Sequence, residues 1–456
     1  MQSFELKNIL EIIEIFNFKE EILPKWEFST DTREKQDSWF IGIKGKNFDG
    51  TLFFKQALES GAKGLILNIN SLNKTDYELC KTLNLPVIFV KDTLKAYQTI
   101  ANHHRKNLNC KVIGITGSNG KTTVKEILKT CIQDYFKVVA TEANENNEIG
   151  VAKTILRADK TTDILIVEMG MRQIGEIKEL THIAEPEIAV ITNIGNSHIG
   201  ILGSKKAIAN AKSEIFYSPQ LKFILLPKDE KLVYPKSSKH IFFGTAEKLE
   251  IYENKINFVY RDHEFSMNTY NHSVINNACI VIDICKELGL NYNQIKQGLS
   301  LFSLTKGRGE IIKLNSGAIL LDESYNANPD SMKILAKSMS KIPNSKKKIL
   351  IMGEMAELGE AFLDLYKEMV EEISGLLDLI ILQNGENQEI LKELFERKKQ
   401  KVLLINSQQE ILEYIQNQKL LKENNILGFK GSRIAKLDEL IEKIKNEVGF
   451  LLPNLV

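Results

Sequence analysis

The sequence is poor in the features that mark secreted and membrane-embedded proteins. Its five cysteines are scattered over 456 residues without a C-x-x-C pair, which indicates reduced thiols in a cytoplasmic protein. No apolar run approaches the roughly 18 residues that a membrane-spanning helix requires. The first residues lack a cationic segment followed by an apolar one, so we expect neither a signal peptide nor membrane insertion.

The chain also lacks an excess of either charge. Its 60 basic and 59 acidic residues give a net charge of +1, so nothing supports a nucleic acid or a membrane surface as partner. An apolar fraction of 43% and a charged fraction of 26% are ordinary for a soluble globular protein. The length predicts two to four domains, and we expect the protein to be a monomer.

A third absence is the GxGxxG fingerprint, which leaves a nicotinamide role without support. Strand and helix patterns nevertheless alternate along the chain, which predicts an α/β fold with parallel sheets covered by helices. We expect a mixed α/β domain over residues 1–105, a central parallel-sheet domain over 106–310 and a Rossmann-like domain over 311–456. Within the central domain, Leu249–Tyr260 is expected to form a hairpin that turns at Glu253 and Asn254.

The strongest motif is TGSNGKTT at residues 116–123. The apolar run Lys111–Thr116 predicts a buried strand before it, and apolar residues at helical spacing follow from Thr122 to Tyr135. A strand, a glycine turn and a helix N-terminus bring backbone N–H groups together in a way that binds phosphate. We expect Lys121 to reach the β- and γ-phosphates of a nucleotide and the Thr122 hydroxyl to bind Mg²⁺. The other expected nucleotide contacts of the loop are Gly117, Ser118, Asn119, Gly120 and Thr123.

Further polar residues follow other predicted strands of the central domain, at the sheet edge where α/β proteins bind ligands. Glu168 ends the strand Ile164–Glu168 and is placed to hold Mg²⁺, although an exposed strand-end acid gives the same pattern. His198 lies in a loop of Gly, Asn and Ser, where its imidazole is suited to bind a metal or orient phosphate. The Asn-rich loop at residues 141–150 is either an ordinary turn or a cover for the γ-phosphate or an incoming carboxylate.

Lys212 lies on a predicted helix beside the apolar stripe of Ile208, Ala211 and Ile215. On the helical pattern alone, Lys212 would be interpreted as an exposed or snorkelling lysine without a role in the site.

The last segment has its own set of polar residues at strand ends. Asp322 ends the strand Ala318–Asp322 and is suited to bind a ribose hydroxyl, while Asp330 or Ser331 would suit the N-cap of the next helix. Arg308 stands between two glycines at the domain boundary, a natural position for a guanidinium that reaches phosphate when domains close. The KGSR segment at residues 430–433 ends the final predicted strand and would suit a carboxylate.

Taken in order, these motifs resemble the Mur ligases, ATP-dependent amide-forming enzymes of peptidoglycan synthesis. The resemblance covers nearly the whole chain and rests on TGSNGKTT at 116–123, NENNEIG at 144–150, EMG at 168–170, NIGNSH at 193–198, AKSEIF at 211–216, DESYNANP at 322–329 and KGSR at 430–433. STDTR at 29–33 and FIGIKGKNFDG at 40–50 resemble the UDP-sugar-binding domain of the family. SYNANPDSM at 324–332 and MGEMAELG at 352–359 resemble the branch that acts on UDP-N-acetylmuramoyl-tripeptide and D-alanyl-D-alanine.

The resemblance implies a reaction and a set of site residues. The peptide carboxylate would attack the γ-phosphate of ATP, and the amine of D-alanyl-D-alanine would then displace phosphate from the acyl phosphate. Catalytic roles are implied for Lys121, Arg308, His198 and Lys212, two Mg²⁺ ions for Thr122, Glu168, His198 and Lys212, and nucleotide contacts for Asn276, Asp322 and Asn326. Substrate contacts are implied for Thr30, Asp31, Thr32, Arg33, Lys44, Gly45, Asn146, Asn147, Tyr325, Lys430 and Ser432.

One modification is expected at this site. Lys212 follows the His198 loop in a site that needs anionic metal ligands, so we expect its terminal nitrogen to carry CO₂ as a carbamate.

Two other functions fit part of the sequence. NKTD at residues 73–76 matches the guanine-reading pattern of GTP-dependent switch proteins, but it precedes the phosphate loop, so that function would need a permuted order. Another carboxylate–amine ligase, such as a folylpolyglutamate synthase, would have the same fold, and the STDTR and YNANP segments argue against it.

Overall fold

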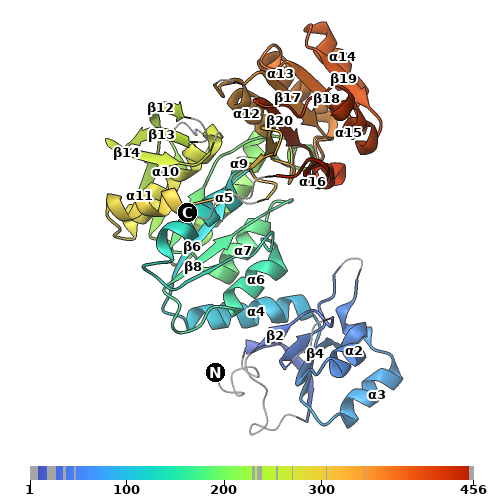
Figure 1. Cartoon of the computed structure of the whole chain (residues 1–456). Helices are drawn as coiled ribbons and strands as arrows, with labels where there is room; N and C mark the ends of the chain where they lie inside the picture. The colour runs from blue at the N-terminus through green and yellow to red at the C-terminus, as the bar shows by residue number, and fades with distance from the viewer. Residues whose placement is uncertain are drawn as a thin grey trace.

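The structure is a computed structural model that describes residues 9–17, 27–33, 37–45, 48–228, 232–233, 239–252, 255–269, 271–304, 306–343 and 345–450. Its described strands form four sheets, three of them wholly or mainly parallel. Figure 1 shows these sheets in chain order, from the blue N-terminal part through the green and yellow centre to the red C-terminal part. The expected α/β fold is confirmed.

The N-terminal sheet has the strand order β1-β5-β4-β3-β2. Only β1 runs antiparallel to its neighbour. Its strands are β1 (Ile12–Phe16), β2 (Phe28–Ser29), β3 (Trp39–Ile41), β4 (Gly64–Asn68) and β5 (Val87–Val90), and its helices are η2 (Gly50–Phe53), α2 (Phe54–Glu59), η3 (Ile69–Ser71) and α3 (Lys74–Thr82).

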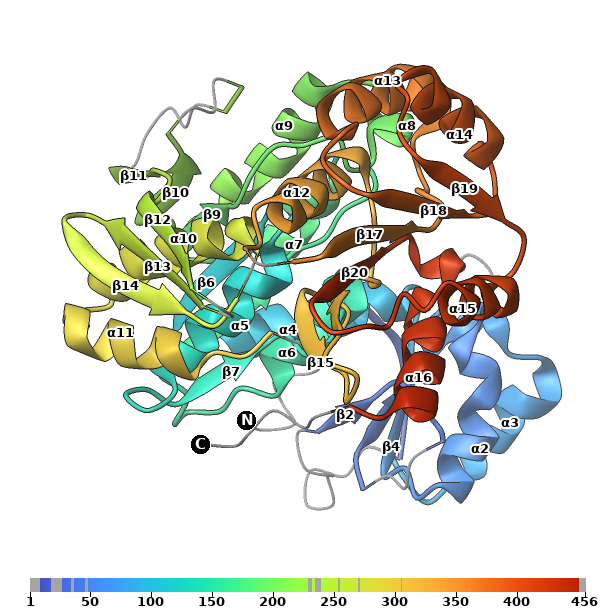
Figure 2. The same cartoon turned by 45° about the horizontal axis from the view of Figure 1, so that its top comes forward.

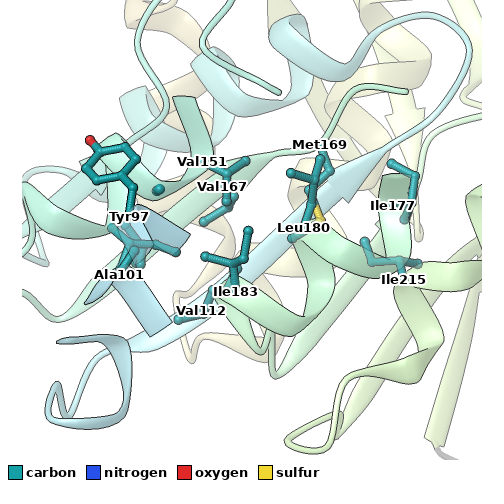
Figure 3. Packing of buried hydrophobic residues seen from close by; sticks show 14 of the residues in the cluster. Tyr97, Ala101, Val112, Val151, Val167, Met169, Ile177, Leu180, Ile183 and Ile215 are labelled. Atoms are coloured by element: carbon teal, nitrogen blue, oxygen red, sulfur yellow. The ribbon is translucent and has the colours of Figure 1, made fainter. Parts of the chain in front are cut away.

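Helix α4 (Thr93–Lys106) joins this sheet to the central one. Asp92 caps its first turn by accepting a hydrogen bond from the Lys95 N–H. Its buried face packs against α6 (Glu148–Leu156) and α7 (Glu176–Ala184) of the central domain. Figure 3 shows Tyr97 and Ala101 of α4 beside side chains of the central domain, in one continuous hydrophobic core.

The central sheet has the order β11-β10-β9-β6-β8-β7, with every pair parallel. Its strands are β6 (Lys111–Thr116), β7 (Val138–Ala140), β8 (Ile164–Glu168), β9 (Ile188–Ile191), β10 (Phe223–Pro227) and β11 (Lys239–Phe243). The remaining helices are α5 (Lys121–Ile132), α8 (Ile199–Leu202), α9 (Lys205–Ser213), η4 (Glu214–Tyr217), α10 (His272–Glu287) and α11 (Tyr292–Leu301). Because β6 lies between β8 and β9, the loops after these three strands meet at one edge.

A small antiparallel sheet is attached to the central domain. It consists of β12 (Glu247–Tyr252), β13 (Lys255–Tyr260) and β14 (His263–Met267), in that order. The expected hairpin is therefore present, its turn residues Glu253 and Asn254 lie outside the described residues, and the sequence pattern missed the third strand. Phe258 and Phe265 stack on each other and join the core beneath α10.

The C-terminal sheet has the order β15-β16-β20-β17-β18-β19, parallel except for β15. Its strands are β15 (Glu310–Lys313), β16 (Ile319–Asp322), β17 (Lys347–Met352), β18 (Leu379–Gln383), β19 (Val402–Ile405) and β20 (Asn425–Lys430). Buried side chains of α12 (Pro329–Ser340), α13 (Phe362–Ile373) and α14 (Gln388–Arg397) form one core cluster, and those of α15 (Gln408–Asn417) and α16 (Leu437–Val448) form another. Figure 2 shows these two groups of helices beside the sheet.

The expectations about the cysteines and about membrane-spanning helices can be compared with this fold. All five cysteines are buried free thiols. Within the described ranges, no helix has both the length and the apolar character needed to cross a membrane.

Candidate active site

A cavity of about 1720 Å³ lies where the central and C-terminal domains meet. The loops that follow β6, β8 and β9 line one side, and residues 306–308, 323–331 and 430–434 line the other. The volume exceeds the usual size of a site for one small ligand, which is up to about 1,000 Å³. The cavity can therefore hold a nucleotide together with part of a second substrate.

The phosphate loop is built by glycine conformations and by the neighbouring loop at residues 192–198. Gly120 has a φ of 82° and precedes the first turn of α5, where the backbone N–H groups of the helix begin. Lys121 folds back and donates from Nζ to the Gly117 carbonyl at 2.9 Å. The Asn119 N–H donates to Asn193 Oδ1 at 3.0 Å, and the Gly195 N–H donates to Ser118 Oγ at 2.8 Å. Hydrogen bonds within the loop and to residues 193–195 thus hold it in this conformation.

We predict that Gly117→Ala destroys this loop. Gly117 has a φ of 149°, and a Cβ added there would lie 1.9 Å from Thr192 Oγ1, so the substitution causes both strain and a clash. Gly289→Ala is the matched control, because Gly289 has a φ of 93° but open space around its Cβ position. We expect Gly117→Ala to lose ATP binding in calorimetry, and Gly289→Ala to bind ATP normally with a stability cost of about 1–2 kcal/mol. Equal ATP affinity in the two variants would contradict this account.

Glu168 is buried against the phosphate loop, so the alternative of an exposed strand-end acid is wrong. Thr122 Oγ1 donates to Glu168 Oε2 at 2.8 Å, and Asn146 Nδ2 donates to Oε1 at 2.8 Å. The Glu168 N–H in turn donates to Thr141 Oγ1 at the start of the Asn-rich loop. A hydroxyl and a carboxylate at this separation are ligands that Mg²⁺ prefers, so these two residues fit a magnesium site. No group of three or more His, Cys, Asp or Glu that could hold a metal was found in the part of the chain that the structure describes.

Lys212 is only 2% exposed, which makes the alternative of an exposed or snorkelling lysine wrong. It lines the cavity, and burial and Lys121, with no carboxylate among the described residues, determine its electrostatic environment. Burial, and to a smaller degree the charge of Lys121, hold the pKa of Lys212 well below its ordinary value. An unpaired buried ammonium is costly, so the arrangement favours the neutral amine.

His198 lies in the left-handed conformation, with a φ of 66°, at the N-terminus of α8. It lines the cavity, and its Nδ1 lies 2.6 Å from Oε2 of Glu357 in the C-terminal domain. Sequence reasoning did not find Glu357, because nothing in the local pattern ties it to His198.

Two cationic side chains of the cavity, Lys121 and Arg308, lie close enough to influence each other. Burial, and then the charge of Arg308, lower the pKa of Lys121, while the Glu168 carboxylate opposes the shift. The Arg308 guanidinium lies 3.8 Å from the ring centroid of Tyr325, which holds it over the aromatic face. These two cationic side chains suit the binding of a polyphosphate.

Lys430 and Ser432 line the same cavity from the C-terminal side. Lys430 Nζ donates to Glu323 Oε2 and to the Asn326 carbonyl, both at 3.1 Å. The Ser432 hydroxyl is buried and has no hydrogen-bond partner among the described residues. A buried polar group without a partner is available to a ligand.

Asp322 is 0% exposed and does not line the cavity. Its carboxylate accepts hydrogen bonds from the Gly307 N–H at 2.9 Å and the Ser324 N–H at 3.0 Å, so it holds the turn that carries Arg308. This placement differs from the expected contact with ribose, which stays a prediction. The N-cap expected for α12, Asp330 or Ser331, was wrong, because Asn328 caps the helix and Ser331 completes a capping box.

Contacts across the domain boundary involve Asn328, Asn196 and Ser197, which had no expected role. Asn328 Nδ2 donates to Asn119 Oδ1 and to Ser197 Oγ, both at 2.8 Å, and Asp330 Oδ2 accepts from the Asn196 N–H at 2.8 Å. The sequence suggests only helix capping for this segment, since the partners are far away in the chain. A Cβ added at Gly120 would lie 2.6 Å from Oδ1 of Asn277, so this buried side chain packs against the phosphate loop. Its neighbour Asn276, for which a nucleotide contact was expected, is exposed and lines the cavity.

Thr30, Asp31, Thr32, Arg33, Lys44 and Gly45 do not line this cavity. They follow β2 and β3 in the N-terminal domain. Hydrogen bonds from the Arg33 side chain and N–H lower the pKa of Asp31 to about 2, and Lys153 of α6 contributes charge. Lys44 Nζ lies 3.2 Å from Asp49 Oδ2. These residues belong to the N-terminal domain and do not share the cavity of the phosphate loop.

The structure also accounts for the NKTD segment. Asn73 caps α3 by accepting a hydrogen bond from the Asp76 N–H, and Lys55 pairs with Asp76. The segment therefore begins a helix in the N-terminal domain and lies outside the cavity.

Comparison with known proteins identifies the family. Residues 115–283 match the Mur ligase middle domain, and residues 307–433 match the Mur ligase glutamate ligase domain. A UDP-N-acetylmuramoyl-tripeptide–D-alanyl-D-alanine ligase of Bacillus subtilis is 32% identical over 96% of this chain and 98% of the relative. The Escherichia coli enzyme of that name is 30% identical over 73% of this chain and 75% of the relative.

Solved structures have the same fold. MurF from Acinetobacter baumannii superimposes with a TM-score of 0.84 at 24% identity, over 98% of both chains. MurF ligase from Thermotoga maritima, solved in complex with ADP, gives 0.80 at 24% identity over 94% of this chain and 99% of that chain. A folylpolyglutamate synthase from Thermotoga maritima gives 0.53 at 17% identity, over 75% of this chain and 91% of that chain. The chain belongs to the Mur ligase family, among the UDP-N-acetylmuramoyl-tripeptide–D-alanyl-D-alanine ligases.

Proposed function

We propose that this protein uses ATP to join D-alanyl-D-alanine to UDP-N-acetylmuramoyl-tripeptide, giving the pentapeptide precursor of peptidoglycan, ADP and phosphate. The observation that carries the proposal is the cavity, which is lined by a phosphate loop on one side and by the buried Lys430 and Ser432 on the other. Relatives that carry out this reaction by name match over nearly the whole chain.

The proposed reaction has two steps. A carboxylate oxygen of the tripeptide attacks the γ-phosphorus of ATP, the bond to ADP breaks, and an acyl phosphate forms. The amine nitrogen of the dipeptide then attacks the acyl carbon, the amine releases a proton, and phosphate leaves. Both reactants of the first step are anions, so Lys121 and Arg308 are needed to offset their repulsion and the charge that develops on the phosphoryl group.

The other residues would hold and orient the reactants. Thr122 and Glu168 would bind one Mg²⁺, and His198 and a carbamylated Lys212 a second, where the metal would screen the phosphate charges. Lys430 and Ser432 would contact the incoming dipeptide, while Tyr325 would keep Arg308 in place. Asn146 and Asn147 would contact the peptide end of the UDP substrate.

We propose separate roles for the three domains. Residues 1–105 would bind the UDP part of the substrate, 106–310 would bind ATP, and 311–456 would complete the site on closure. The hydrogen bonds from Asn328 to Asn119 and from Asn196 to Asp330 support coupling between the last two. The protein would act as a monomer in the cytoplasm.

Phosphate release from ATP tests the function directly. The enzyme is incubated with UDP-N-acetylmuramoyl-tripeptide, with and without D-alanyl-D-alanine, and with GTP in place of ATP. Sustained release that needs both substrates and ATP, with the pentapeptide product seen by mass spectrometry, is the expected result. Sustained release with a folate and glutamate instead would favour the alternative ligase, and preference for GTP would favour a switch protein.

We predict that Arg33→Ala raises the KM for the UDP substrate and leaves ATP binding unchanged. Arg33 and its partner Asp31 lie in the N-terminal domain, outside the cavity that holds the phosphate loop. Loss of one charge-assisted contact typically costs about 1.5–3 kcal/mol. Steady-state kinetics with each substrate varied in turn would measure the effect. A raised KM for ATP instead would mean that the domain roles are assigned wrongly.

A further inference from the structure

The segment MGEMAELG at residues 352–359 has no role in the proposed chemistry. It follows β17 and ends at η5 (Gly359–Ala361), at the boundary with the central domain. There the Gly200 N–H of α8 donates to the Glu357 carbonyl at 3.2 Å. A Cβ at Gly200 would lie 2.4 Å from the Gly359 nitrogen, and one at Gly359 would lie 2.7 Å from the Gly200 Cα. Two glycines thus allow the backbones of the two domains to touch.

This close approach brings the side chain of Glu357 to His198. Oε2 of Glu357 lies 2.6 Å from His198 Nδ1, and Oε1 lies 3.8 Å from Nε of Arg172. Glu357 and His198 both adopt the left-handed conformation, with φ values of 64° and 66°. That conformation costs about 1–2 kcal/mol for a residue with a side chain, and such outliers persist where surrounding contacts require them.

We propose that Glu357 is a positioning residue for His198. A carboxylate oxygen 2.6 Å from Nδ1 holds the imidazole ring in one orientation. His198 lines the cavity, so this orientation decides which edge of the ring the reactants meet there. Because Glu357 belongs to the C-terminal domain, the imidazole is set correctly only when that domain lies against α8.

This inference rests on the proposed ligase function, and it is tested by Glu357→Ala and Glu357→Gln in the full-length enzyme. Loss of a residue that orients a metal-binding histidine typically lowers activity about 10- to 100-fold. We therefore expect kcat of Glu357→Ala to fall by that factor, with the KM for the UDP substrate unchanged. Glu357→Gln keeps an acceptor oxygen and should retain part of the rate. Glu360→Ala removes an exposed carboxylate three residues away and should behave as wild type.

A second readout does not depend on turnover. The chain has only seven histidines, so ¹⁵N spectra of the histidine-labelled, ligand-free enzyme can be assigned for His198 with a His198→Gln variant. We expect the ring-nitrogen signals of His198 to shift in Glu357→Ala and to stay unchanged in Glu360→Ala. Unchanged His198 signals in Glu357→Ala, or unchanged kcat, would overturn the proposal. A fall in kcat with an increased radius of gyration and no recovery in Glu357→Gln would also overturn it, since Glu357 would then only hold the domains together. Absence of ligation by the wild type would refute the proposed function, while the His198 spectra would still decide the role of Glu357.

Discussion

Lys121→Ala should lower the rate of ligation by a factor of about 10²–10³ while leaving the fold intact. Lys121 lies at the start of α5, and its ammonium donates to the Gly117 carbonyl within the loop that would receive the phosphates. Burial, aided by the charge of Arg308, lowers the pKa of Lys121. The same burial means that water screens the interaction between this lysine and an arriving polyphosphate poorly. Its contribution is largest when charge develops on the transferred phosphoryl group.

The measurement is phosphate release together with circular dichroism and thermal unfolding. Lys129→Ala is the matched control, because Lys129 lies on the same helix and is exposed. The control should keep both the rate and the melting temperature. Near-normal turnover by a folded Lys121→Ala enzyme would mean that the loop does not bind the transferred phosphate.

Lys212→Ala should abolish ligation, and a short carboxylic acid such as acetate should restore part of it. Burial lowers the pKa of Lys212 well below its ordinary value, which favours the neutral amine, whose nitrogen lone pair can attack the carbon of CO₂. The N–C bond forms, one C–O bond loses its double-bond character, and a proton leaves the nitrogen. The product is an anion that can bind metal as a glutamate does. In the alanine variant, acetate would occupy the vacated space and supply the missing carboxylate.

Kinetics with and without acetate check this prediction, and mass spectrometry under mild conditions checks for the added CO₂. Lys206→Ala lies on the exposed face of the same helix α9 and should keep full activity without any response to acetate. Full activity of Lys212→Ala would contradict the proposed carbamate. An unmodified Lys212 in an active, metal-bound enzyme would contradict it equally.

Several features were readable from the sequence because their causes are local. Apolar runs between polar turns predicted β6 and β8 with the bounds that the structure has. The glycine turn before α5 was equally clear: Gly120 has a positive φ, and the helix predicted from Thr122 begins one residue earlier, at Lys121. β15 was missed, because the four residues Glu310–Lys313 are stabilised by pairing with β16 and have little signal of their own.

The roles of single residues depended on contacts between distant parts of the chain. The sequence left Lys212 open to an exposed position, and only the packing of α9 buries it without a partner charge. Asp322 ends a strand as expected, yet its carboxylate is used by Gly307 and Ser324. Glu357 gave no local signal, because its partner His198 lies on another domain.

The sequence by itself determined the α/β fold, the phosphate loop and the family, because backbone propensity, apolar periodicity and glycine turns act within a few residues. Tertiary structure decided which side chains share the cavity and in what state. The order of β8, β6 and β9 in the sheet brings three loops to one edge, and the packing of α9 buries Lys212. The meeting of the two domains places Glu357 beside His198. Burial and electrostatic coupling are sums over neighbours in space, and those neighbours come from segments far apart in the chain.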